Sequence, residues 1–271
     1  MSDLEVVVVD DHSEDGTEEI FRDIADDRIT FLAHSSNRGG NAARQTGIDA
    51  SGGELIAFLD ADDTWYPEKL ERQVAALDDA GQGMGLAYTW FDQELTTGEL
   101  IPGGRSTSGG LNTPALLRGN FIGTFSSVIV RRSALEQAGG PDPTLPACQD
   151  WEFYLRLNQV TGIVPVPQVL VRYWRGDDDP HRISSNPARV ASGHREIYRR
   201  YRDRIATLNV EDSVASRRYF LGMLANHADP AGTLLVAKDT PRQEWTPTGT
   251  LVFTHMFLRS LRKRYGAWSY R

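Results

Sequence analysis

Apolar and polar positions alternate along the first 180 residues in blocks typical of strands and helices. Short apolar runs predict strands over 4–9, 28–32, 54–59 and 85–90. The first of these runs is rich in valine, which is typical of a strand buried on both faces. Polar, helix-forming stretches between the runs predict helices over 17–26, 41–50 and 67–79. Strands separated by helices of this length favour an α/β fold with a mostly parallel sheet flanked by helices.

The pattern continues with shorter elements and then changes near residue 180. It predicts a loop or β-ribbon over 95–110, a strand over 126–131, strands broken by prolines over 164–173, and helices over 113–119, 133–138 and 150–159. Beyond residue 180, arginine-rich helices are expected over 187–205, 213–227 and 250–265. We therefore expect an α/β domain over 1–180 and a helical C-terminal region over 181–271.

The charge of the chain narrows its possible partners. There are 37 Asp and Glu against 29 Lys and Arg, giving a net charge of −8. This balance disfavours broad nucleic-acid binding, which needs a basic face to neutralise phosphates. Of the acidic residues 23 are Asp, and only three of the basic residues are Lys. Such a composition resembles cytoplasmic proteins of salt-loving archaea. A GC-rich genome is the alternative, although it favours Arg over Lys without enriching Asp.

The remaining composition excludes several classes of site and segment. Cys148 is the single cysteine, which excludes an intramolecular disulfide and a zinc site built from several cysteines. The first ten residues carry acids and then valines, unlike a signal peptide. No run of 18 apolar residues is present. We expect a cytoplasmic protein whose membrane contact, if it has any, is peripheral.

Acidic clusters follow two of the predicted strands. Asp10 and Asp11 end the first strand, and the sequence DADD at 60–63 ends the third. Ligands of open α/β sheets gather at the carboxyl ends of parallel strands. A D-x-D there can direct alternate carboxylates to one Mg²⁺ or Mn²⁺ ion, which commonly bridges to a diphosphate. The alternative is a solvated turn, because Asp is also a turn residue.

A series of ordered blocks resembles family 2 glycosyltransferases, inverting enzymes of the GT-A fold that use nucleotide sugars. The central block is ELIAFLDADDTWYPEKLERQV, preceded by LEVVVVDDHSEDGT and NRGGNAARQTGIDASGGE. Downstream, NFIGTFSSVIVRRSALEQAGGPDPTL resembles the acceptor-side segment, and CQDWEFYLRL resembles the segment that holds the catalytic base. Together the blocks span about residues 4–160. The resemblance implies a nucleoside-diphosphate-sugar donor and a glycan or polyprenyl-phosphate-linked acceptor, in surface-glycan or protein glycosylation.

The resemblance also implies roles for carboxylates and for one arginine. Asp11, with Asp10 beside it, corresponds to the residue that recognises the nucleotide base. Arg38, in the glycine-rich approach, corresponds to a nucleotide contact, and Arg44 lies on the next helix. Asp62 corresponds to the metal ligand and Asp60 to its partner, which contacts the metal or the donor sugar. Mn²⁺ or Mg²⁺ is the implied cofactor.

Two further positions complete the implied site. Asp150 occupies the position of the catalytic base, which accepts a proton from the acceptor hydroxyl in a single displacement. The alternative for Asp150 is a helix N-cap. His181, in the sequence HRIS, resembles a position near the diphosphate and the metal. The aromatic side chains of Trp65, Tyr66, Trp151 and Phe153 could stack on sugars, but packing is the commoner role of such residues.

The sequence departs from the family at its start. Family members open with a hydrophobic strand ending in a Pro-x-Tyr-Asn-like segment, and this chain begins almost at the second strand. We expect a start codon set too far downstream. The rival is a degenerate, non-catalytic nucleotide-sugar-binding protein. A nucleotidyltransferase is a further alternative, although the GxGTR-type loop expected for one is not visible.

The C-terminal segment offers a contact with membranes. Residues 250–271 combine apolar side chains with arginine, lysine, Trp268 and Tyr270. A basic amphipathic segment suits a negatively charged membrane surface. The equal alternative is a helix that packs on the catalytic domain with its basic side chains outward.

Overall fold

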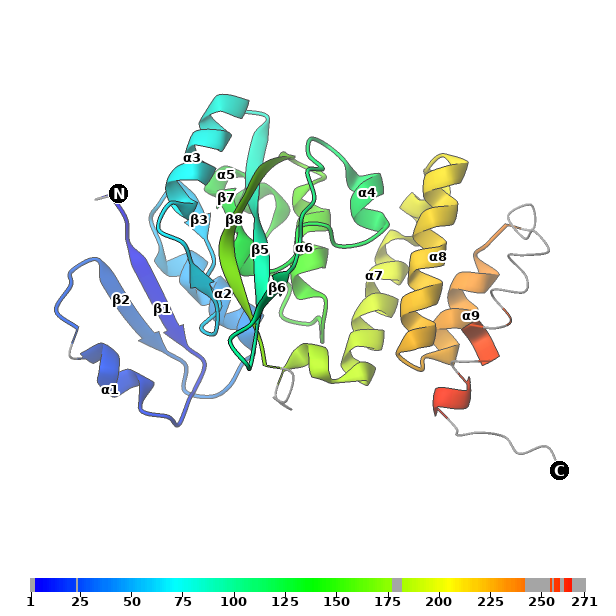
Figure 1. The fold of residues 1–271 in the computed structure, drawn as a ribbon, viewed down its shortest axis with the longest axis horizontal. Coiled ribbons are helices and arrows are strands. Elements are labelled where there is room, and N and C mark those ends of the chain that lie inside the picture. The colour runs from blue at the N-terminus through cyan, green and yellow to red at the C-terminus, as the bar shows by residue number, and fades with distance from the viewer. Residues whose placement is uncertain are drawn as a thin grey trace. The chain divides into compact units, whose positions relative to one another are not determined.

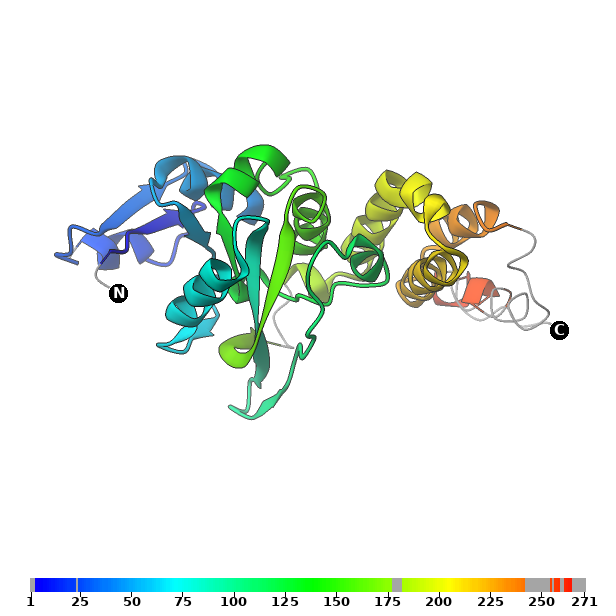
Figure 2. The ribbon, with the colours of Figure 1, turned by 90° about the horizontal axis from the view of Figure 1, so that it is seen from above.

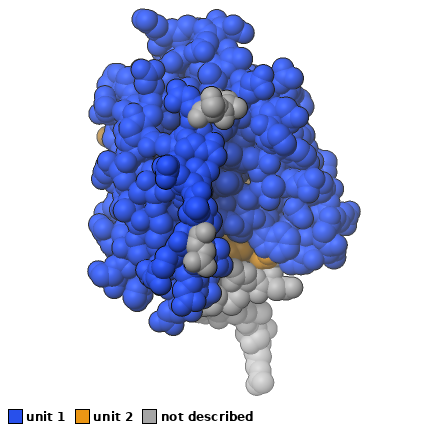
Figure 3. All heavy atoms as spheres, turned by 90° about the vertical axis from the view of Figure 1, so that its left-hand side faces the viewer, with its two compact units in different colours: residues 1–112, 121–144, 149–175 blue, residues 113–120, 145–148, 176–271 orange. Residues whose placement is uncertain are grey.

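The computed structural model describes residues 3–22, 24–176, 182–241, 254, 256–258 and 261–264. Their path is drawn in Figure 1. The chain divides into two compact units, coloured in Figure 3. Unit 1 comprises residues 1–112, 121–144 and 149–175, and unit 2 comprises residues 113–120, 145–148 and 176–271.

Unit 1 begins with a parallel pair of strands. β1 (Val6–Asp10) and β2 (Ile29–Ala33) are joined through the short helix α1 (Thr17–Arg22). Helix α2 (Gly40–Ala50) follows. It packs close to β1, because a Cβ added at Gly47 would lie 3.6 Å from the Val9 side chain. Glu5 Oε1 accepts hydrogen bonds from the backbone N–H groups of Gly52 and Gly53, so the loop after α2 is fastened to the start of β1.

The second sheet of unit 1 has a mixed strand order. Its order is β3 (Leu55–Ala57), β7 (Val128–Arg131), β5 (Met84–Leu95), β8 (Gly162–Arg175) and β4 (Thr64–Trp65), with β6 (Leu100–Pro102) paired to β5. The α/β class is confirmed, but the expectation of mostly parallel pairing needs correction. β1–β2 and β5–β8 are parallel, whereas β3–β7, β5–β7, β5–β6 and β4–β8 are antiparallel. β7 is entered from a 3₁₀ turn, η1 (Phe125–Ser127), and not from a crossover helix, so it need not run parallel to its neighbours.

β8 corrects the prediction of strands broken by proline. It is one continuous strand of 14 residues that contains Pro165 and Pro167. Its register along β5 runs from Thr89↔Val166 to Trp90↔Val169, so Pro167 lies in a bulge. A proline inside a sheet removes one ladder hydrogen bond, and a bulge is the place where that loss is tolerated.

Helices cover both faces of the second sheet. α3 (Lys69–Ala80) lies on one side of the β5–β8 pair, and α5 (Arg132–Ala138) and α6 (Gln149–Leu157) lie on the other (Figure 2). The buried cluster under α3 contains Leu77, Ala87, Ile129, Val166 and Leu170. This packing fixes the C-terminal end of β3, which leads to Asp60, and the first turn of α6, which contains Asp150.

The predicted double burial of the first strand is wrong. None of the four valines of β1 is fully buried, and Val6 is 39% exposed. Within the described residues β1 pairs with β2 alone, and β3 pairs with β7 alone. A strand with a sheet neighbour on one edge only leaves part of its side-chain surface open to water.

Unit 2 is helical, as expected for the C-terminal region. Its main helices are α4 (Thr113–Leu117), α7 (Pro187–Thr207), α8 (Val210–Asn226) and α9 (Pro230–Lys238), with a 3₁₀ turn, η2 (Ile183–Ser185), before α7. Asn186 caps α7 by accepting from the N–H groups of Ala188 and Arg189, both at 3.1 Å. Of the helix expected over 250–265, residues 254, 256–258 and 261–264 are described and helical, and the other positions lie outside the described residues. No helix in the described part of the chain has the length and apolarity needed to span a membrane.

Candidate active site

The acidic sequence 60–63 forms a turn at the end of β3. Asp63 N–H donates to Asp60 C=O at 3.0 Å, and Asp60 N–H donates to Ser126 Oγ at 3.0 Å. Asp62 is exposed, whereas Asp63 is only 8% exposed. Asp60 is thus held by η1 and Asp63 is buried, whereas exposed Asp62 is still consistent with the solvated-turn alternative.

Arg44 of α2 connects this turn to the helix before it. Its Nη2 forms an ion pair with Asp60 Oδ1, and its Nη1 donates to Asn41 Oδ1 at 3.0 Å. The guanidinium also lies 4.1 Å from the centre of the Phe125 ring. These contacts fix both the position and the plane of the guanidinium. The first carboxylate of the D-x-D is thus already neutralised by a side chain of the protein.

Asp150 lies in the first turn of α6, on the same patch of unit 1. Burial raises the pKa of its carboxyl to about 6, while the Trp151 N–H and the charge of Arg44 act to lower it and the charge of Asp60 raises it. Asp150 and Asp60, 90 residues apart in the sequence, therefore lie within electrostatic reach of each other. Asp150 Oδ1 accepts from Trp151 N–H at 2.7 Å, and Asp150 is the second residue of α6, which begins at Gln149.

An aromatic layer lies beneath this cluster. Tyr154 is fully buried, and its hydroxyl donates to Thr124 C=O at 2.9 Å. Burial raises the pKa of Tyr154 well above its usual value, and the charges of Asp150 and Asp60 raise it further. The Tyr154 and Phe125 rings lie 6.1 Å apart. Tyr154 therefore stays neutral and contributes a rigid, low-dielectric floor under the two carboxylates.

Asp11, at the end of β1, holds the glycine-rich loop. Its Oδ1 accepts from Arg38 N–H at 2.9 Å and contacts His34 Nδ1 at 2.7 Å, and its Oδ2 accepts from Gly39 N–H at 2.6 Å. Burial acts to raise the pKa of Asp11, but the bonds from His34, Arg38 and Gly39 outweigh it and lower the pKa. Both oxygens are engaged within the protein, so recognition of a base through Asp11 stays a prediction.

The neighbours of Asp11 are arranged differently. Asp10 Oδ1 accepts from the N–H and the hydroxyl of Ser13, at 3.1 and 2.5 Å, which closes a local turn. The Arg38 side chain is exposed beside the loop. This arrangement leaves the Arg38 guanidinium available to solvent or to a nucleotide, whereas Asp10 has a structural partner.

The predicted metal ligands, Asp60 and Asp62, stay a prediction. Asp60 and Asp62 offer the hard carboxylate oxygens that Mg²⁺ and Mn²⁺ prefer. In the described part of the chain no group of three or more His, Cys, Asp or Glu side chains could hold a cation. His181, the third predicted ligand, lies outside the described residues. Asp60 and Asp62 alone do not form a complete protein cage for a cation, so any cation there would need further ligands from outside the described side chains.

Asp63 was not among the predicted site residues. Burial raises its pKa to about 6, while the Ser126 hydroxyl and the Trp174 N–H lower it and the charges of Asp60 and Asp62 raise it. Sequence reasoning also left Arg44 and Ser126 without a role. Arg44 and Asp60 lie 16 residues apart on different elements, and no local pattern announces their contact.

The aromatic side chains near the site are mainly packing residues. Trp151 is 2% exposed and Phe153 is fully buried, so neither presents a face to a sugar. Trp65 donates from Nε1 to Ser126 C=O at 2.8 Å, and Lys69 Nζ lies 4.0 Å from the centre of a Trp65 ring. The Tyr66 hydroxyl accepts from Arg172 Nε at 3.0 Å. The packing interpretation of Trp151 and Phe153 is confirmed.

Cys148, two residues before Asp150 in the sequence, has no sign of activation. Its Sγ lies 3.4 Å from His194 Nδ1. Burial lowers the pKa of His194 to about 4, so the imidazole is neutral at physiological pH. A neutral imidazole does not provide the positive charge that stabilises a thiolate.

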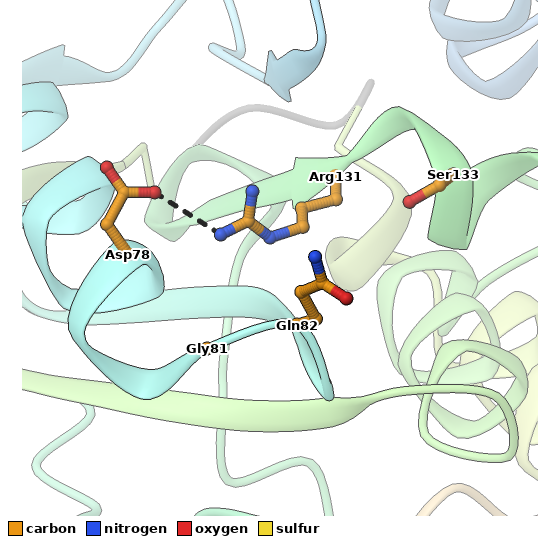
Figure 4. A pocket seen from close by; sticks show the side chains of 5 residues that line it. All are labelled: Asp78, Gly81, Gln82, Arg131 and Ser133. Carbon is orange, nitrogen blue, oxygen red and sulfur yellow. Dashed lines mark hydrogen bonds and ion pairs between the residues drawn. The ribbon is translucent and has the colours of Figure 1, made fainter.

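A separate polar hollow of about 500 Å³ lies elsewhere in unit 1 (Figure 4). Asp78, Gly81, Gln82, Arg131 and Ser133 line it. Arg131 approaches Asp78 at 3.3 Å and donates to the carbonyls of Leu77 and Met84. Arg131 pairs with Leu55, the first residue of β3, whereas Asp60 follows the last residue of β3. The hollow and Asp60 therefore lie toward opposite ends of this strand. It contains none of the predicted site residues.

Several curated proteins are similar in sequence to parts of this chain. WfgD of Escherichia coli, a UDP-Glc:alpha-D-GlcNAc-diphosphoundecaprenol beta-1,3-glucosyltransferase, is 38% identical over 159 residues, covering 59% of this chain and 61% of WfgD. Glycosyltransferase AglE of Haloferax volcanii is 43% identical over 82 residues, 30% of this chain and 27% of AglE. The succinoglycan biosynthesis protein ExoO of Rhizobium meliloti is 46% identical over 78 residues, 29% of this chain and 22% of ExoO. The chain thus spans less than two thirds of each relative.

A solved structure shares the fold. The structure of S. aureus TarS 1–349 in complex with UDP-GlcNAc superposes with a TM-score of 0.59 at 14% identity, covering 100% of this chain and 85% of that chain. At this identity the likeness concerns the fold, which matches the GT-A-like arrangement expected from the sequence. Residues 1–139 match the family described as Glycosyl transferase family 2. Because this match covers just over half of the 271 residues and includes the D-x-D turn, the chain belongs to glycosyl transferase family 2.

Proposed function

We propose that the protein transfers a sugar from a nucleoside-diphosphate donor to a glycan or lipid-linked acceptor with inversion at the anomeric carbon. The observation that carries the proposal is the grouping of Asp150, Asp60 and Arg44 on one patch of unit 1. WfgD and a second Escherichia coli relative, WfaP, are both named UDP-Glc:alpha-D-GlcNAc-diphosphoundecaprenol beta-1,3-glucosyltransferase, and these names support the acceptor class. TarS with UDP-GlcNAc supports the donor class.

Asp150 is the proposed general base. The hydroxyl oxygen of the acceptor attacks the anomeric carbon while the bond from that carbon to the diphosphate oxygen breaks. The acceptor proton passes to the Asp150 carboxylate, and the electron pair of the broken bond leaves with the nucleoside diphosphate. A single displacement of this kind needs one base and no nucleophile of the enzyme. A pKa of about 6 keeps Asp150 mainly ionised at neutral pH and makes it a better proton acceptor than an ordinary carboxylate.

Asp60 and Asp62 are the proposed carboxylates for Mn²⁺ or Mg²⁺. A cation bound there supplies positive charge that neutralises the departing diphosphate. The Arg44 guanidinium already balances Asp60, so Asp60 suits a donor-sugar contact or a weak cation ligand, and exposed Asp62 suits the stronger ligand role. Arg38 and the Asp11-held loop are the proposed nucleotide contacts, and His181 stays a proposed diphosphate contact.

We also propose that a further strand completes the sheet between β1 and β3. Support comes from the open pairing edges of β1 and β3 in the described residues and from exposed apolar side chains beside them, Val6 at 39% and Leu59 at 50%. The gene sequence upstream of Met1 tests this point. An in-frame hydrophobic segment ending in a Pro-x-Tyr-Asn-like sequence is expected, and stop codons directly upstream would favour the non-catalytic alternative.

Charge segregation supports a membrane contact on the cytoplasmic face. Unit 1 carries 27 Asp and Glu against 12 Lys and Arg, whereas unit 2 carries 17 Lys and Arg against 10 Asp and Glu. Helix α7 alone holds six Arg and two acids. A basic unit attached to an acidic one favours anionic lipid headgroups as a partner. The C-terminal segment 250–271 stays the proposed contact, and most of it lies outside the described residues.

The organism is proposed to be a haloarchaeon. The Asp-rich, Lys-poor composition supports this, and so does the local identity to AglE of Haloferax volcanii. An acidic surface keeps proteins soluble where charge is strongly screened. Refolding yield in multimolar KCl against dilute buffer tests it, and a protein equally stable in dilute buffer would argue for a GC-rich mesophile.

Acceptor-dependent release of UDP or GDP from candidate donors in the presence of Mn²⁺ is the test of the main proposal. Release that requires both acceptor and cation is expected. Release of pyrophosphate from a nucleoside triphosphate would indicate the nucleotidyltransferase alternative. Donor binding without any turnover would indicate the non-catalytic alternative.

A further inference from the structure

The acidic turn is anchored on one side by Ser126. Ser126 is fully buried in η1, and its Oγ accepts from Asp60 N–H at 3.0 Å. Its carbonyl accepts from Trp65 Nε1 at 2.8 Å. One residue thus holds the beginning and the end of the segment from 60 to 65. The backbone hydrogen bond at Asp60 fixes the peptide plane from which the Asp60 side chain extends.

The other side of the turn is anchored by Asp63. Asp63 Oδ1 accepts from Trp174 N–H, near the end of β8, at 2.9 Å. At the very next residue β4 begins to pair with β8, with Thr64 opposite Arg172 and Trp65 opposite Val171. Asp63 therefore extends the β4–β8 connection into the turn. Its Oδ2 is buried, and this oxygen has no hydrogen-bond partner among the described residues.

Three carboxylates within four residues repel one another unless the backbone is held. A buried carboxylate is also costly for the fold, since it leaves water for an environment of lower dielectric constant. A short segment that carries such a cost and is tied to two separate elements, η1 and β8, is suited to fixing the direction of its side chains. Asp62, between the two anchors, is the exposed member that points away from the core.

We propose that Ser126 and Asp63 are positioning residues that hold the Asp60 and Asp62 carboxylates in the geometry required by the donor diphosphate and its cation; this inference rests on the proposed function. Neither residue touches the reacting atoms. Ser126 acts through the backbone of Asp60, and Asp63 acts through the link between the turn and β8. Loosening either anchor is expected to weaken cation binding, in the way that outer hydrogen-bond partners of metal ligands do in other sites.

The chain offers matched variants for this test. Ser126→Ala removes the acceptor for Asp60 N–H and the hydroxyl that lowers the pKa of Asp63, and it leaves the carbonyl that binds Trp65. Ser127→Ala is the control, because Ser127 is equally buried and its hydroxyl donates to Thr124 C=O at 2.7 Å. Asp63→Asn keeps an oxygen for Trp174 N–H without the charge, whereas Asp63→Ala removes the oxygen.

The test measures Mn²⁺ binding to the full chain in the presence of UDP, with electron paramagnetic resonance as the readout. The melting temperature of each variant is measured in parallel. Ser126→Ala and Asp63→Ala are expected to weaken Mn²⁺ binding about tenfold or more. Ser127→Ala and Asp63→Asn should stay within about twofold, with similar melting temperatures for the two serine variants. If Ser126→Ala binds Mn²⁺ like Ser127→Ala, or Asp63→Asn is as weak as Asp63→Ala, the positioning role is overturned. Wild-type protein that binds no Mn²⁺ with UDP would overturn the proposed function as well.

Discussion

The guanidinium of Arg44 is paired with the carboxylate of Asp60, which joins helix α2 to the D-x-D turn. The same positive charge acts on Asp150, where it opposes the rise in pKa caused by burial. Arg44 therefore links the carboxylate assigned to the donor with the carboxylate assigned to the acceptor. Its removal should disturb both sides of the reaction.

Arg44→Ala is expected to lower kcat/KM by at least about tenfold, since it removes a preorganised charge next to the site. It should also move the acidic limb of the pH–rate profile to higher pH, because the Asp150 carboxyl loses a stabilising positive charge. Steady-state rates across pH check both effects. Arg28→Ala is the control, because it breaks an Arg–Asp ion pair with Asp26 away from the acidic cluster. An unchanged pH profile in Arg44→Ala would show that the two charges are uncoupled.

The rate of transfer should depend on one carboxyl with a pKa near 6. Asp150 must be ionised to accept a proton, and burial raises its pKa from 3.8 to about 6. The rate is therefore expected to rise as pH increases through 6 and to level off above 7. Asp150→Asn should reduce the rate by about 100-fold or more, the usual worth of a general base. A rate that is flat between pH 5 and pH 7 would contradict the assignment.

The ionised Asp150 carboxylate should also lower the free energy of unfolding. Its folded-state pKa lies above the unfolded value of 3.8, so the folded state binds the proton more tightly. The corresponding stability is present at low pH and is lost as pH rises through 6. Asp150→Asn is therefore expected to raise the melting temperature at pH 8 and to change it less at pH 5. Equal changes at both pH values would argue against a buried, ionised carboxylate.

Lys69 is a second buried charge with the opposite sign. It is fully buried, and burial lowers its pKa from 10.5 to about 7. Between these values the unfolded chain binds the proton more tightly, so the free energy of unfolding should rise from pH 7 to pH 10. Denaturant unfolding across this range checks the slope. Lys69→Met should flatten it, whereas a slope that survives this change would point to other groups.

Two glycines of unit 2 should respond in opposite directions to alanine. A Cβ at Gly193 of α7 would lie 2.5 Å from Ala147 O and 2.8 Å from Ala147 C, both backbone atoms. Gly193→Ala is expected to cost about 1–3 kcal/mol through overpacking. At Gly222 of α8 the nearest atom is Met256 Cε at 3.7 Å, so Gly222→Ala should stabilise by about 0.5–1 kcal/mol. Thermal unfolding of both variants checks the contrast, which equal shifts would refute.

Local sequence patterns predicted the positions of most helices and strands. They failed where the structure depends on which strands pair with each other. The helix over 41–50 is found as Gly40–Ala50, because its end is marked by Gly52 and Gly53. The antiparallel placement of β7 and the continuous course of β8 through Pro165 and Pro167 depend on which strand edges meet. Those meetings are set by contacts between distant segments, and no short window of sequence contains them.

The candidate site was predictable in its members and not in their contacts. The resemblance to family 2 selected Asp60, Asp62 and Asp150, and the structure brings Asp60 and Asp150 together. The resemblance gave no sign that Arg44 neutralises Asp60. It also gave no sign that both carboxylate oxygens of Asp11 accept hydrogen bonds from the loop at Arg38 and Gly39. Such hydrogen bonds join residues 16 to 28 positions apart, so the three-dimensional fold alone reveals them.

Acceptor-dependent sugar transfer by wild-type protein and by Asp150→Asn, compared at pH 7.5 with donor binding measured in parallel, tests the central claim most directly. The account predicts transfer by the wild type and a loss of about 100-fold or more in Asp150→Asn, with donor affinity unchanged, because Asp150 acts on the acceptor proton. Undiminished transfer by Asp150→Asn would contradict the account.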